Sequence, residues 1–157
     1  GETAAAVGRR MVIVTINPQV HGGVLAIVER NLRATLFHEL HHLARGVSSG
    51  AMPTRTILDL AIHEGMATAF ERDFADANYP WGRYPEEVAD WVEELTVLPN
   101  TANRDHWMFR HPDGRRWIGY KAGAYLVDRA IRATGLSAAE MISIPSDELF
   151  RLALRQP

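Results

Sequence analysis

The sequence contains no cysteine among its 157 residues. A disulfide framework is therefore excluded, and so is any metal site built on thiolate ligands. If the chain binds a metal ion, the protein ligands must come from histidine, aspartate and glutamate. The lack of cysteine does not by itself fix the cellular compartment.

Long apolar runs and an excess of basic charge are also missing. The longest apolar segment, MVIVTI at residues 11–16, has the length of a strand and is far shorter than the roughly 20 residues that cross a bilayer. The net charge is −2, which gives no reason to expect nucleic acid or an anionic membrane as a partner. Lys121 is the only lysine, which we attribute to arginine-biased coding.

The N-terminal segment carries little targeting information. The chain begins GETAAAVGRR, without an initiator methionine or the apolar core of a signal peptide. We interpret this as a processed or truncated start, so that upstream sequence would be missing. With no signal peptide and no membrane span in this sequence, the cytoplasm is the favoured location. The length and an apolar content of 46% predict a single domain over residues 1–157.

Pattern and punctuation predict a mainly helical fold with a small β-sheet, which is an α+β class. Alternation over residues 11–16, stopped by Pro18, predicts a strand, and the apolar run at 24–28 predicts a second one. Capping residues, glycines and prolines then predict helices over residues 31–46, 56–75, 85–95 and 117–134, and a last short helix from Pro145–Ser146.

Two capping boxes and two loops complete this prediction. Thr56 with Asp59, and Ser137 with Glu140, have the spacing with which a side chain and a backbone amide cap each other at a helix start. The segments 46–56 and 99–115 are rich in polar residues, glycine and proline, and we expect both to be loops.

The most unusual segment is LFHELHHLAR at residues 36–45, which places three of the seven histidines within five residues. His38 and His42 are four residues apart, so both project from one face of a helix and can bind a single cation. Glu39 is offset around the helix, where it can face a metal-bound water without being a ligand. These residues form the HExxH pattern of zinc metallopeptidases. His41 occupies neither motif position, and we expect it to be solvated or hydrogen-bonded.

The apolar side of this helix is expected to be a leucine stripe. Four leucines recur at helical spacing and predict the buried face of an amphipathic helix: Leu32, Leu36, Leu40 and Leu43.

A catalytic zinc site usually has three protein ligands, and the next predicted helix, LAIHEGMATAFERDF, offers the third. Twenty-one residues separate His42 from Glu64, which is enough for this helix to return antiparallel to the first. Glu64 shares a face with small and apolar residues, where a carboxylate is costly unless a metal ion compensates it. His63 is rotated by about 100° from that face, nearer Phe70 and Phe74, and we expect a structural role for it.

A resemblance becomes visible at this point. HELHH on one helix followed by EGMA on a second resembles the gluzincin class of zinc metallopeptidases. Farther along, HWMFR and RRWIGYKAGAYLV are similar to the tryptophan-rich loop and G-Y-x-x-G helix of a family of predicted zinc-dependent proteases of unknown function. The resemblance extends from about Gly22 to Leu126. It implies a zincin-like core and one zinc ion per chain, with His38, His42 and Glu64 as ligands and Glu39 as general base.

One position departs from the gluzincin pattern. In better-known gluzincins an aspartate four residues after the ligand glutamate orients a zinc-binding histidine, but Thr68 stands there in this chain. The orienting group must differ, with Glu71 and Asp59 as candidates.

The mechanism also needs a hydrogen-bond donor to the oxyanion, and three residues are candidates for it. Tyr120, at the G-Y-x-x-G position, is the first choice, and His106 and His111 are the alternatives. Trp107 and Trp117 are candidates for the wall of a cleft.

The expected function is that of a zinc-dependent hydrolase acting on a peptide or protein substrate. In the favoured mechanism a zinc-bound water attacks the scissile carbonyl and Glu39 takes its proton. Either predicted strand could pair with an extended peptide. One alternative is a zinc-bound peptide-binding or regulatory module without turnover, which would not need Glu39. A di-iron carboxylate protein is a weaker alternative, because Glu39-x-x-His42 is the only Glu-x-x-His in the sequence.

Overall fold

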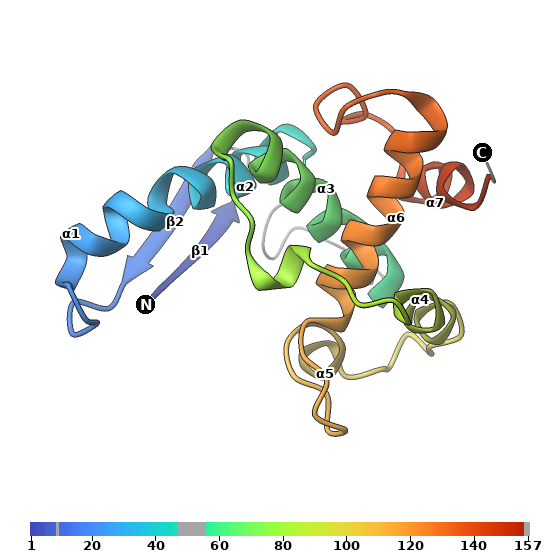
Figure 1. The fold of residues 1–157 in the computed structure, drawn as a ribbon, viewed down its shortest axis with the longest axis horizontal. Helices are drawn as coiled ribbons and strands as arrows, with labels where there is room; N and C mark the ends of the chain where they lie inside the picture. The colour runs from blue at the N-terminus through green and yellow to red at the C-terminus, as the bar shows by residue number, and fades with distance from the viewer. Residues whose placement is uncertain (9, 47–55, 156–157) are drawn as a thin grey trace.

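The computed structural model describes residues 1–8, 10–46 and 56–155, and this part of the chain is mainly helical with one small sheet (Figure 1). The elements follow in the order β1 (Glu2–Val7), β2 (Met11–Ile16), α1 (Gly23–Ile27), the π-helical segment η1 (Val28–Leu32), α2 (Arg33–Ala44), α3 (Ile57–Ala75), the 3-10 turn η2 (Pro80–Gly82), α4 (Val88–Thr96), α5 (Arg104–Met108), α6 (Ile118–Thr134) and α7 (Ser146–Leu154). The predicted mixture of helices and a small sheet is confirmed. None of the described helices combines the length and the apolar character that crossing a membrane requires.

The sheet is an antiparallel hairpin of β1 and β2, with Glu2 opposite Ile16 and Val7 opposite Met11. The strand predicted at residues 11–16 is confirmed, but the one predicted at 24–28 is wrong. Those residues form α1 and the start of η1, and the chain continues as a helix into α2. A five-residue apolar run has no periodicity that separates a strand from a helix. The true partner, β1, is rich in alanine, which is uncommon in strands.

Helix α3 is the centre of the buried core. It begins with the predicted capping box, because Thr56 Oγ1 accepts from the amide of Asp59 at 3.1 Å and the Asp59 carboxylate accepts from the amide of Thr56 at 3.3 Å. It extends to Ala75, as predicted, and the next residue, Asp76, is left-handed with φ 53°.

The most extensive contact in the described part of the molecule is that of α3 with α6. A Cβ atom on Gly65 of α3 would overlap the backbone of Gly123, and a Cβ on Gly123 would overlap the carbonyl group of Ala61. The two helix backbones therefore touch, and only glycine fits at these positions. Helix α6 ends at Gly135, as predicted, with φ 72°.

Several boundaries differ from the prediction. Helix α4 begins at Val88, because Pro85 starts a turn in which its carbonyl oxygen accepts from the amide of Val88 at 3.2 Å. The segment 99–115, predicted as a loop, contains the short helix α5. The Ser137–Glu140 bonds form, but the residues that follow are turns. The start of α7 at Ser146 is confirmed. Most of the predicted loop 46–56 lies outside the described residues.

Candidate metal centre and pocket

Helix α2 buries polar side chains rather than a leucine stripe. Leu40 is 50% exposed, and the leucines at 32, 36 and 43 are only partly buried. The buried side chains are instead Ala34, His38, Glu39, His41 and His42. The stripe prediction was wrong because β1 and α3 both pack on the polar side of the helix. Four buried ionisable side chains on one short helix are costly unless their partners lie close by.

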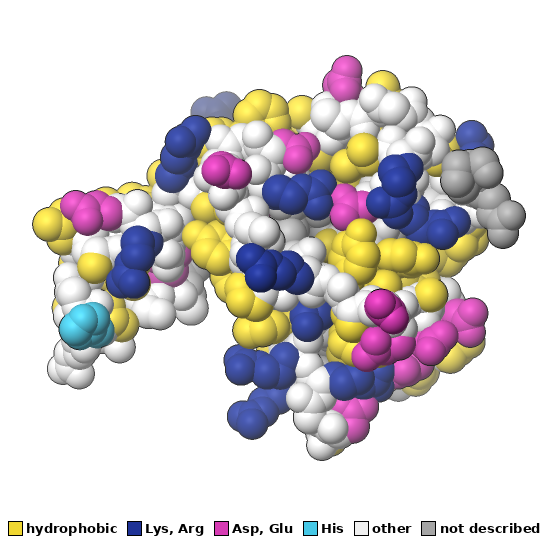
Figure 2. Space-filling model, in the orientation of Figure 1, with side chains coloured by type: hydrophobic (Ala, Val, Ile, Leu, Met, Phe, Trp, Pro, Cys, Tyr) yellow, Lys and Arg dark blue, Asp and Glu magenta, His cyan; other side chains and the backbone are white. Residues whose placement is uncertain are grey.

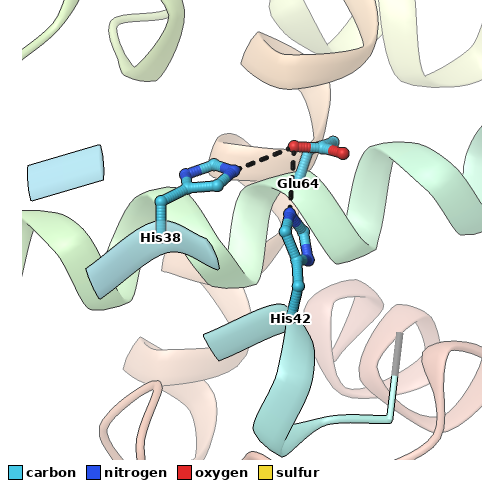
Figure 3. A group of neighbouring side chains, drawn as sticks. All are labelled: His38, His42 and Glu64. Atoms are coloured by element: carbon cyan, nitrogen blue, oxygen red, sulfur yellow. Dashed lines mark hydrogen bonds and ion pairs between the residues drawn. The ribbon is translucent and has the colours of Figure 1, made fainter. Parts of the chain in front are cut away.

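Two of these histidines converge on a carboxylate from α3 (Figure 3). Glu64 Oε2 lies 3.1 Å from His38 Nε2 and 3.5 Å from His42 Nε2. The three atoms that could bind a metal all lie within 4.8 Å of one another. Burial opposes the charge of Glu64, but the neighbouring His42 and His38 hold the pKa of this carboxyl well below its ordinary value. Two imidazole nitrogens and an ionised carboxylate are a ligand set that zinc prefers.

The other ring nitrogen of His38 meets a second carboxylate. Nδ1 lies 3.1 Å from Glu71 Oε2, and Glu71 Oε1 accepts from Trp81 Nε1 at 3.3 Å. Burial lowers the pKa of His38, but Glu64 and Glu71 together raise it to about 10. If His38 bound a metal ion through Nε2, a proton on Nδ1 directed at Glu71 would fix the orientation of the ring. Of the two candidates for the orienting group, Glu71 contacts His38, whereas Asp59 belongs to the capping box.

Glu39 and Tyr120 flank the three converging residues. Glu39 Oε2 accepts a hydrogen bond of 2.6 Å from the backbone amide of Ala6 in β1, which fixes the direction of the carboxylate. Burial, the charge of Glu64 and the charge of Glu39 raise the pKa of Tyr120 well above its ordinary value. Its hydroxyl is therefore protonated, and can donate, throughout the neutral range.

A pocket of about 450 Å³ opens onto His38, Glu39 and Tyr120. Figure 2 shows the molecule hollowed between the lobe of the hairpin with α1 and the lobe around α5. The pocket is lined by Glu2, Thr3 and Ala4 of β1, by α2, by the end of α3, and by the aromatic residues Tyr79, Trp81, Phe109, Trp117 and Tyr120.

Residues 12–151 match the family described as Predicted Zn-dependent protease (DUF2268). The chain belongs to this family. The match includes α2, α3 and α6 but not β1, so the strand that binds Glu39 lies outside it. No curated protein and no solved structure matches the chain significantly.

Several predicted site residues lie away from the pocket of this family member. His106 is exposed on α5, and His111 lies 2.9 Å from Asp113 with its ring against Trp107. None of these residues lines the pocket, in contrast to Trp117, which does.

Sequence reasoning missed two groups of pocket residues. The side chains of Tyr79 and Trp81 stack at 4.5 Å in a segment that reads only as a turn, and β1 reads only as an alanine-rich start. No local pattern could have found either group.

The remaining two buried histidines face away from the pocket. His63 Nδ1 accepts from Arg45 Nε at 3.0 Å, and its Nε2 lies 3.2 Å from Ser146 Oγ, which fits the expected structural role. His41 packs on Phe70, with ring centroids 5.3 Å apart. His41 is 1% exposed and neither ring nitrogen has a partner among the described residues. The expectation that it is solvated or hydrogen-bonded was wrong, because burial of this position depends on α3.

Proposed function

We propose that this chain is a zinc metallopeptidase of gluzincin type with a zincin-like core. The observation that carries the proposal is the convergence of two imidazole nitrogens on one ionised carboxylate, with one of the two histidines, His38, lining a pocket together with Glu39. The family description, which names a predicted zinc-dependent protease, supports the same function.

The donor set fits a zinc ion, with His38, His42 and Glu64 as its ligands and one ion per chain. Within the described residues, the ion pairs of Glu64 are with these two histidines and with no arginine or lysine. A buried carboxylate needs a positive partner to offset its loss of hydration, which protonated His38 supplies in the metal-free chain and a zinc ion would supply when bound. When bound there, zinc would polarise a scissile carbonyl and lower the pKa of a water molecule to about 7.

Glu39 is the proposed general base. The amide of Ala6 holds Oε2, while Oε1 has no hydrogen bond to a described residue and can accept a proton from the attacking water. The same carboxyl would then pass the proton to the leaving amine. Tyr120 is the proposed donor to the oxyanion, since its hydroxyl stays protonated beside the two glutamates.

Strand β1 is the proposed guide for the peptide. The amide of Ala6 points away from β2 toward Glu39, so residues two and four positions earlier, Ala4 and Glu2, present their amides and carbonyls on the same free edge. Both line the pocket. An extended peptide pairing with this edge would pass in front of Glu39. The guide is thus β1 rather than either of the two segments considered from the sequence.

The alternatives differ in what they require of Glu39. A zinc-bound module that binds peptides without turnover has no need of a free carboxylate oxygen facing a pocket. A di-iron protein would need a second cluster of carboxylates and histidine, and the described residues contain one metal-binding group, that of His38, His42 and Glu64.

The test combines metal content with hydrolysis. We expect the purified protein to carry, or to take up on titration, about one zinc per chain, and to cleave members of a mixed peptide library. Glu39→Gln should keep the zinc but lose activity by about 10²–10⁴-fold, because the amide cannot accept the proton. Chelation should lower the melting temperature, since a metal bound only to the folded state stabilises it.

Each outcome has a distinct meaning. Protein that neither carries nor binds zinc would remove the basis of the proposal. Loss of zinc in Glu39→Gln would make Glu39 a ligand. Zinc binding with no cleavage of any peptide would favour the non-catalytic module.

A further inference from the structure

The loop between α5 and α6 forms a rigid rim beside the pocket. The amide of Trp117 donates to the carbonyl of Phe109 at 3.0 Å, and Arg110 and Arg116 form an antiparallel bridge. The turn closes through Gly114, which has φ 97°. Backbone hydrogen bonds across the loop therefore fix the direction in which residues 110 and 116 leave it.

Arg115 anchors this rim to the core. Its guanidinium donates two hydrogen bonds to the Glu94 carboxylate, at 2.8 and 2.7 Å, and one to Asp113 at 2.7 Å. It also lies 5.4 Å from the centroid of the Trp91 ring. A bidentate arginine–carboxylate pair holds both partners in one geometry, so the loop has little freedom to turn.

Within the described part of the chain, Arg110 and Arg116 differ from Arg115 in lacking carboxylate partners. Both are exposed, and among the described residues neither has a carboxylate partner. They are directly opposite each other in the bridge, where two like charges are destabilising. An anion that binds both side chains would offset the repulsion between these two like charges.

The two arginines flank the pocket wall. Phe109 precedes Arg110, Trp117 follows Arg116, and both aromatic residues line the pocket. The Arg116 guanidinium lies 4.3 Å from the centroid of the Trp117 ring, so its charge is held against that wall. Figure 2 shows Lys and Arg side chains gathered on the side of α5 that faces the hollow. Arg104, exposed at the start of α5, adds a third positive charge in this region.

Trp117 itself has an unusual backbone. Its φ is 56°, in the left-handed region that a bulky side chain avoids. The hydrogen bonds of Trp117 to Phe109 and to Lys121 hold this conformation, and the Trp117 side chain lines the pocket.

We propose that Arg110 and Arg116 bind a carboxylate of the substrate, so that the site selects peptides that bear an acidic group near the scissile bond. The selection rests on the proposed peptidase function, which supplies the scissile bond. The carboxylate has two possible sources, the side chain of Asp or Glu and the free C-terminus of the peptide.

The experiment uses the zinc-loaded chain and peptides that share one cleaved sequence. One series is capped at both ends and replaces Gln by Glu at single positions. A second series has no acidic residue and compares a free C-terminus with an amide. We expect one of the carboxylate-bearing peptides to have a kcat/KM about tenfold above its neutral counterpart, and the gap should narrow as salt is added.

Variants of the two arginines test whether they cause the preference for carboxylate-bearing peptides. Arg110→Glu combined with Arg116→Glu should invert the ratio, so that a Lys-containing peptide is cleaved faster than its Glu-containing counterpart. Arg116→Lys should keep most of the preference, because it keeps the charge. Arg151→Gln removes a single positive charge from exposed α7, where its ion pairs are with Asp147 and Glu148, and should leave the ratio unchanged.

The outcomes separate this inference from the proposed function. Equal cleavage of acidic and neutral peptides, or a preference that survives the double charge reversal, would contradict carboxylate binding by Arg110 and Arg116. Neither result would contradict the proposed peptidase function. If no peptide is cut, binding of the same peptides to the Glu39→Gln variant decides. A tenfold tighter binding of the carboxylate-bearing peptide would support carboxylate binding by the two arginines, although the peptidase proposal had failed. Equal affinities would contradict both proposals.

Discussion

The two faces of α3 differ in the kind of contact they make. Toward α6 it presents Ala61 and Gly65, and the contact is backbone against backbone. Toward α2 it presents Glu64 and Glu71 to His38, with aromatic packing farther along the helix. The first face fixes position and the second carries polar chemistry.

The packing of α3 on α6 fixes the position of the polar residues on the other face. Glu64 is next to Gly65 in sequence, and Tyr120 lies between two glycines of α6, Gly119 and Gly123. Touching backbones cannot slide without a clash, so the carboxylate and the phenol keep one relative position. Gly65 and Gly123 therefore fix the relative position of the two helices that carry Glu64 and Tyr120, whereas Gly119 lies against Met108 and not in this contact.

The largest effect should come from closing the space between the two helices. In Gly123→Ala the new Cβ would overlap the carbonyl oxygen of Ala61, which belongs to a buried helix and cannot move aside. We expect a loss of folding stability of about 3 kcal/mol or more, measured by thermal or urea denaturation. Gly119→Ala is the matched control. Its Cβ would meet the thioether of Met108, which can change rotamer, so the loss should be smaller. Equal stability of Gly123→Ala and the parent chain would mean that the backbones are not in contact.

The next effect separates two adjacent residues of α3. Glu64→Ala should weaken zinc affinity by more than the roughly 10–100-fold typical of an outer-shell residue, because it removes a proposed ligand. His63→Ala should leave most of the affinity and lower stability instead, since it breaks hydrogen bonds with Arg45 and Ser146. Zinc titration and melting curves of both variants make the comparison. The reverse ranking in zinc affinity would indicate a three-histidine site.

A smaller loss of zinc affinity is expected from Glu71→Gln. The amide can still accept from His38 Nδ1, but it loses the charge that strengthens this imidazole as a ligand. We expect affinity to fall about 10–100-fold with the fold retained. Asp59→Asn changes the other candidate, which only caps α3, and should leave zinc binding unchanged. If the two variants ranked the other way, the orienting group would be misassigned.

The part of the site that could be predicted depends on local geometry. His38 and His42 share one helix, so their spacing alone places them on one face, and Glu64 followed from the cost of a carboxylate on a buried face. Helix ends at Thr56 and Gly135 were likewise set by neighbouring residues. What failed depends on contacts between distant segments. The polar side of α2 is buried because β1 and α3 cover it, and no residue within 36–45 carries that information.

His41 shows the same limit and gives the smallest predicted effect. Burial first, and then the charges of His42 and Arg45, lower its pKa from 6.5 to about 3. Below about pH 6.5 the imidazole is therefore protonated in the unfolded chain, but in the folded chain it stays neutral down to about pH 3. This residue accordingly reduces the free energy of unfolding progressively as the pH falls from 6.5 toward 3. His41→Leu removes that contribution together with two unsatisfied ring nitrogens, while an apolar side chain remains against Phe70. We expect metal-free His41→Leu to be as stable as the parent chain at pH 8, or about 1–2 kcal/mol more stable, with the advantage growing toward pH 5. Urea denaturation at the two pH values measures this, and His106→Leu, at an exposed position, should show no such trend. A less stable His41→Leu would show that the imidazole has a partner that stabilises it.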